Sequence, residues 1–135
     1  MIKDLEKELW ELVEASKGNK PYCKPREQQD NLEELLMNYT QADILALNKM
    51  WHIIRFRIAE AYKDELYNKI FHFGCDGYDY CTSWMVGQGK KLYDTYMKCG
   101  CEAVINYVQK YKIPEEEYSY EDISYAFLYA AFDRK

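Results

Sequence analysis

Apolar residues recur at intervals of three and four along most of this chain, which is the spacing of one face of a helix. The first such row runs from Ile2 to Ser16, and a shorter one covers about Glu27 to Asn38. The longest row covers about Gln41 to Tyr62. Thr40 and Asp43 supply an N-cap and an acidic first turn for it. The first half of the chain is therefore predicted to contain three helices.

Glycines divide the second half of the chain. The stretch Cys75–Asp79 carries acids and a glycine, so a sharp turn is expected there. Gly87-Gln88-Gly89 is expected to interrupt a helix or to let another backbone approach closely. Ser119 and Asp122 form a second cap pair, which predicts the start of the last helix. The expected helices of this half cover about 66–71, 78–86, 90–97, 104–108 and 119–130.

Together the rows predict an all-α fold, an irregular bundle of six to eight short helices in a single domain over residues 1–135. Trp10, Trp51 and Trp84 are expected in or near its core. At 135 residues, with 48% hydrophobic and 30% charged residues, the composition is that of an ordinary globular domain.

Charge narrows the classes of partner. The chain carries 23 acidic against 18 basic side chains, a net charge of −5. A nucleic-acid binder that follows the phosphate backbone needs a basic face, so that class is disfavoured, and a basic protein partner suits the chain better. No apolar run reaches the roughly 20 residues of a membrane span, and the charged N-terminus does not resemble a signal peptide. We expect a cytoplasmic protein.

Two segments carry a family resemblance. Leu9–Ala15 reads LWELVEA, and Gly74–Gly89 reads GCDGYDYCTSWMVGQG. In order and content they resemble the opening helix and the central glycine-acid-aromatic loop and helix of the bacterial DUF4240 family, over about residues 8–132. The chain departs from the family pattern at Cys75-Asp76-Gly77, where members often carry Ser-Asp-Asp-Gly, so one acid of the loop is absent. It also departs at Cys81, where an aromatic is usual.

The resemblance implies an α-helical fold and transfers no catalytic residue, since the family is defined by unknown function. Some small proteins of this general type belong to bacterial toxin–immunity systems. The resemblance therefore suggests an immunity protein.

The preferred functional hypothesis is a non-enzymatic protein-binding module that neutralises a basic toxin domain by occlusion. Its predicted contact surface is an acidic and aromatic stretch near the C-terminus, since aromatic side chains dominate interface energetics and charge guides encounter. The predicted contact residues are Glu115, Glu116, Glu117, Tyr118, Tyr120, Glu121 and Asp122. The competing interpretation is an acidic helix start in solvent, with the tyrosine rings packed on their own domain.

The alternative hypothesis is a small-ligand-binding protein or enzyme with a polar site at Asp76, Asp79, Trp84 and Gln88. Helix capping explains both aspartates without any chemistry, and neither a nucleophile motif nor a phosphate loop accompanies them. A deep cleft lined by these residues would favour the ligand, and a flat acidic surface would favour the protein partner.

Metal binding is the least favoured chemistry. Five cysteines without a secretory signal suit reduced thiols. His72, Cys75, Cys81, Cys99 and Cys101 lack the two close ligand pairs of a structural zinc site. We therefore expect neither a metal nor a cofactor.

Overall fold

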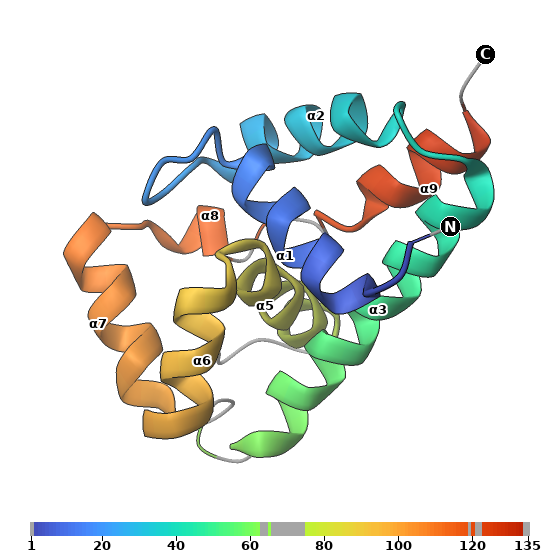
Figure 1. The fold of residues 1–135 in the computed structure, drawn as a ribbon. Coiled ribbons are helices and arrows are strands. Elements are labelled where there is room, and N and C mark those ends of the chain that lie inside the picture. The colour runs from blue at the N-terminus through green and yellow to red at the C-terminus, as the bar shows by residue number, and fades with distance from the viewer. Residues whose placement is uncertain (1, 63–64, 66–74, 119, 121–122, 134–135) are drawn as a thin grey trace.

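The computed structural model describes residues 2–62, 65, 75–118, 120 and 123–133, and within residues 75–79 only the backbone. This part of the chain contains eight helices and no strand, which confirms the predicted all-α bundle (Figure 1). The helices are α1 (Leu5–Ser16), α2 (Pro25–Leu36), α3 (Gln41–Ala61), α5 (Cys75–Gly87), α6 (Lys90–Cys99), α7 (Cys101–Tyr111), α8 (Glu115–Tyr118) and α9 (Tyr125–Phe132).

The first three helices start where local chemistry favours a start. The Asp4 carboxylate accepts a hydrogen bond from the Lys7 backbone N–H at 3.1 Å and caps α1. The predicted cap of α3 is confirmed, since Thr40 Oγ1 accepts from the Asp43 N–H at 3.1 Å. Helix α2 begins at Pro25, two residues before the predicted start, because the missing N–H of proline is no loss in a first turn.

Two predicted boundaries in the second half were wrong. Cys75–Asp79 is not a loop, because α5 already begins at Cys75. Gly77 falls in the first turn, whose N–H groups need no intrahelical partner, so the glycine does not prevent a helix. The last helix starts at Tyr125 after Ser124, and the proposed cap residues Ser119 and Asp122 lie outside the described residues.

The core forms around α3, which packs on α1, α5 and α9. Trp51 is fully buried, its ring centroid lies 5.6 Å from that of Phe127, and its indole N–H donates to Ser83 Oγ at 2.8 Å. Trp84 is also fully buried and Trp10 is 5% exposed, so all three tryptophans lie in the core as predicted. The inner face of α3 consists of Ile44, Leu47, Trp51, Ile54 and Ile58.

Helix α9 lies between α2 and α3 (Figure 1). Gln41, at the start of α3, donates to the Ala131 carbonyl near the end of α9 at 2.8 Å. Farther along α3, His52 Nε2 lies 3.4 Å from Ser124 Oγ at the start of α9. The two helices therefore run antiparallel. None of the helices in the described part of the chain is long and apolar enough to cross a membrane.

Candidate functional site

The two segments that carry the family resemblance meet in space, at the turn between α5 and α6. Lys17, which follows α1, donates from Nζ to the Gln88 carbonyl at 2.7 Å. Glu14 Oε1 lies 3.8 Å from the same ammonium. Gly89 has φ +108°, and a Cβ placed there would overlap the Glu14 carboxylate. The end of α1 therefore holds the Gln88–Gly89 turn in a conformation that requires glycine.

Side chains also satisfy the last groups of α5. Gln28 Nε2 donates to the Gly87 carbonyl at 2.6 Å and to Ser16 Oγ at 3.2 Å. Gln88 Nε2 donates back to the Trp84 carbonyl at 2.9 Å, and its Oε1 accepts from the Tyr107 hydroxyl at 2.9 Å. Terminal carbonyls of a helix lack intrahelical partners. Gln28 of α2 and Lys17 after α1 bond the Gly87 and Gln88 carbonyls, and Tyr107 of α7 bonds the Gln88 side chain, so three helices meet at this end of α5. We call it the structural junction of the domain.

A pocket of about 620 Å³ opens beside this junction, and we call it the Lys17 pocket. Its charged lining residues are four lysines and one glutamate, a reversal of the net acidic charge of the chain. The lining residues are Glu14, Lys17, Asn19, Lys20, Pro21, Gln88, Lys91, Leu92, Thr95, Ala103, Asn106, Tyr107, Lys110 and Tyr111.

The Lys17 ammonium is the buried charge of this pocket, since the residue is only 5% exposed. Burial, followed by the nearby Tyr111 and Glu14, raises the pKa of the Tyr107 hydroxyl well above its usual range. Tyr107 therefore remains a neutral hydrogen-bond donor at the pocket wall. The site combines one buried cation, three exposed cations and neutral polar groups.

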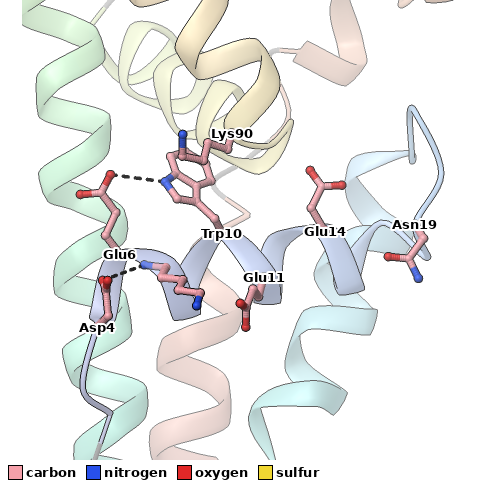
Figure 2. Close-up of a pocket in the computed structure, with 8 residues that line it drawn as sticks. Asp4, Glu6, Trp10, Glu11, Glu14, Asn19 and Lys90 are labelled. Atoms are coloured by element: carbon pink, nitrogen blue, oxygen red, sulfur yellow. Dashed lines mark hydrogen bonds between the residues drawn. The ribbon is translucent and has the colours of Figure 1, made fainter.

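A second hollow, of about 700 Å³, runs along α1 and is drawn in Figure 2. The Glu6 side chain turns towards Trp10 there and accepts from its indole N–H at 3.4 Å. Glu6 also pairs with Arg57 at 3.0 Å, and Asp4 serves as the cap of α1. Asp4 and Glu6 thus already have structural roles, so this hollow is a weaker candidate for a ligand site than the Lys17 pocket.

Large apolar side chains are exposed where α3 and α9 pack side by side. Phe56 is 61% exposed and Phe132 is 62% exposed. Leu45 and Phe56 share a helix face with Gln41 and His52, two α3 residues whose side chains contact residues of α9 or its N-cap. Leu128 and Phe132 continue the face of α9 that begins at Ser124. We call Leu45, Phe56, Leu128 and Phe132 the α3–α9 face.

Acidic side chains gather at one end of this face. Partial burial, then the charges of Asp30 and Asp133, raise the pKa of the Glu33 carboxyl. Asp133 immediately follows Phe132 in sequence, so the negative charges border the apolar surface. The α3–α9 face therefore combines exposed apolar area with an acidic border.

The predicted acidic-aromatic stretch is used largely within the domain. Glu115 and Glu116 are exposed, but Glu117 accepts a short hydrogen bond from the Tyr22 hydroxyl. The Tyr118 ring centroid lies 5.9 Å from that of Trp84, and Tyr120 donates to Gln29 Oε1 at 2.8 Å. The remaining two predicted contact residues, Glu121 and Asp122, lie outside the described residues.

Of the four predicted ligand-site residues, the structure describes the side chains of Trp84 and Gln88 only, and these two do not line one pocket. Gln88 lines the Lys17 pocket, whereas Trp84 is buried and does not line it. Asp76 lies twelve residues before Gln88, so the helical rise separates their backbones by about 18 Å. The side chains of Asp76 and Asp79 lie outside what the structure describes.

Among the described side chains, Cys81 lacks the features of a reactive thiol, and the cysteines form no metal-binding cluster. Cys81 is fully buried, and burial together with Glu115 raises the pKa of its thiol to about 12, so it is not a thiolate at neutral pH. No group of three histidine, cysteine or acidic side chains that could hold a metal ion occurs in this part of the chain. His72 and the Cys75 side chain are outside it.

Sequence reasoning identified Gln88 but missed the other residues of the Lys17 pocket and all of those on the α3–α9 face. The pocket lysines come from separate helices and loops, and no local motif joins them. Phe56 lies in the same apolar stretch as the buried Ile54 and Ile58, so composition alone does not mark it as exposed.

Comparison with known proteins adds the family and nothing about activity. No curated protein and no solved structure matches the chain. The model of the family described as "Protein of unknown function (DUF4240)" matches residues 5–133, nearly the whole chain. The chain therefore belongs to the DUF4240 family.

Proposed function

We propose that this protein is a non-catalytic protein-binding module that docks a partner protein on the α3–α9 face. The observation that carries the proposal is the exposure of Phe56 and Phe132, at 61% and 62%, on two helices packed side by side. Phe56 and Phe132 lie at opposite ends of the antiparallel pair, about 20 Å apart along it, and Leu45 and Leu128 lie between them. A row of exposed apolar side chains along a helix pair is a candidate interaction site.

The energetics favour covering this surface. Fully burying an exposed Leu or Phe side chain contributes about 1.5–3 kcal/mol. Four such side chains along one interface supply enough to offset a large part of the entropy lost on association. Aromatic residues near the centre of an interface also contribute most strongly to binding.

The acidic border selects the kind of partner. Burial, and then the charges of Asp30 and Asp133, raise the pKa of Glu33, so this carboxylate lies near two like charges that repel it. A partner with lysines or arginines around an apolar patch relieves that repulsion and is steered electrostatically. Occlusion of a basic toxin domain by an immunity protein is one function that fits such a partner.

The exposed acids Glu115 and Glu116 give a second candidate surface for the same function. They are carried by α8, which packs mainly on α5. Their contribution would be mainly to the rate of encounter, which depends on salt.

Affinity capture from native extract tests the proposal with three paired substitutions. Phe56→Ser with Phe132→Ser removes the most exposed side chain at each end of the α3–α9 face, and Glu115→Lys with Glu116→Lys reverses the charge of two α8 acids. Met37→Ser with Met97→Ser is the matched control, because these exposed apolar residues lie outside the face.

We expect the phenylalanine pair alone to lose a captured basic protein, and the lost protein to rebind the purified wild-type chain. Loss with the Glu115 and Glu116 pair instead would move the site to α8. Equal loss with the methionine pair, or a wild-type dimer that the phenylalanine pair abolishes, would contradict docking of a separate basic partner.

A further inference from the structure

The Lys17 pocket is unexplained by docking on the α3–α9 face. It lies between α6, α7 and the loop after α1, whereas that face is formed by α3 and α9. Its volume of about 620 Å³ falls within the range of small-molecule sites. The pocket is therefore a second candidate site, of a size that suits a small molecule.

The charges of the lining residues favour a negatively charged occupant. Lys17, Lys20, Lys91 and Lys110 outnumber the one acid in the lining, Glu14. Lys20 lies 3.5 Å from Glu27 and Lys110 lies over the Tyr111 ring at 5.3 Å, so both are already oriented by neighbours. In a chain of net charge −5 this local reversal concentrates positive potential in one concave site.

Among the lining residues, the buried Lys17 most strongly favours a bound anion. An ammonium group has three N–H donors. One donates to the Gln88 carbonyl at 2.7 Å, and the Glu14 carboxylate lies at a longer 3.8 Å. A buried cation with donor capacity left is stabilised by an anion placed against it.

The neutral lining residues indicate what the occupant carries besides its acidic group. Asn106 and Thr95 offer polar groups, while Leu92 and the Tyr111 ring give an apolar wall. A bare inorganic ion would leave most of the pocket unfilled, so the lining suits an organic skeleton that carries an acidic group. Such a combination of a few polar groups with apolar walls is typical of ligand sites.

We propose that the Lys17 pocket binds a small organic anion through a phosphate or carboxylate group held by Lys17, with Lys91 and Lys110 at the rim. The organic part lies against Leu92 and Tyr111. This binding is a property separate from protein docking and involves no covalent step.

Amide NMR titration of the full chain tests the proposal with three probes at constant ionic strength. Pyrophosphate represents the phosphate group, succinate represents the carboxylate, and succinamide is an uncharged analogue of succinate. Shifts are expected at Gly89, Leu92 and Tyr107 with one or both anions and not with succinamide. A response to one anion alone assigns the acidic group of the ligand.

Exposed lysines provide a matched pair of variants. Lys91→Gln with Lys110→Gln should lower the affinity for the anion about tenfold, the magnitude expected for the loss of two partly screened charge contacts. Lys49→Gln with Lys98→Gln removes the same charge from outside the pocket and should change affinity less than about twofold. All four side chains are exposed, so both double variants should fold, which circular dichroism checks.

Three results would overturn the proposal. The first is no localised shift with either anion at about 10 mM. The second is an equal response to succinamide. The third is an equal loss of affinity in the Lys49 and Lys98 pair, which would reduce the binding to general surface charge.

Discussion

Substitution of Gly89 by alanine tests the junction between α1 and the α5–α6 turn. Gly89 has φ +108° and ψ 172°, a backbone region that is populated almost only by glycine. An alanine there carries a strain of about 1–3 kcal/mol. Its Cβ would also overlap the Glu14 carboxylate, so one of the two groups must move.

The steric part of the cost is smaller than the backbone part. Glu14 is 45% exposed and can rotate into solvent, at the cost of its 3.8 Å contact with Lys17. A partly exposed ion pair of that kind contributes about 0.5 kcal/mol. We therefore expect Gly89→Ala to lower the free energy of unfolding by about 2–3 kcal/mol.

Urea denaturation followed by tryptophan fluorescence measures this change. Gly18→Ala is the matched control, because Gly18 also has a positive φ, +66°, while the nearest atom to its Cβ would be Lys20 Cε at an ordinary 3.7 Å. That substitution should cost about 1 kcal/mol. In a Glu14→Ala background the cost of Gly89→Ala should fall by about 0.5 kcal/mol. The reasoning is refuted if Gly89→Ala costs no more than Gly18→Ala.

Three further predictions concern buried polar groups, and urea denaturation measures each of them. Lys17→Met should cost about 1–2 kcal/mol, because it removes the donor to the Gln88 carbonyl; unchanged stability would mean that this bond does not hold the turn. Ser83→Ala should cost about 1–2 kcal/mol by leaving the buried Trp51 N–H without its acceptor, and a smaller loss in a Trp51→Phe background would attribute the cost to that bond. Burial and the Glu8 carboxylate raise the pKa of Tyr39 from 10.0 to about 12. This raised pKa contributes stability that is fully present below pH 10 and is lost as the pH rises from 10 towards 12, so Tyr39→Phe should lose less stability across that interval than wild type does. An equal loss in both proteins would contradict the role of Tyr39.

The helices were predictable because their signals are local. The apolar row over about Gln41 to Tyr62 and the Thr40 cap both lie within or next to the helix they specify, and α3 confirms them. Boundaries were less predictable where one residue type suits two structures. Glycine and aspartate favour turns, but the first turn of a helix tolerates both, and α5 therefore begins at Cys75.

The candidate sites were mostly beyond sequence reasoning because they depend on tertiary packing. Lys17, Lys91 and Lys110 belong to different parts of the chain, and only the packing around Gln88 brings them to one pocket. In the acidic and aromatic stretch, by contrast, the local sequence suggested a contact surface, and tertiary packing uses part of it inside the domain. Glu117 and Tyr118 have the composition of an interface, yet they contact Tyr22 and Trp84 of their own domain.

Hydrogen exchange of the chain, alone and within its captured complex, tests most directly whether partners dock on the α3–α9 face. The account predicts slower exchange in the complex for the amides of α3 around Leu45–Phe56 and of α9. Protection confined to α8, or no protection anywhere in α3 and α9, would contradict it.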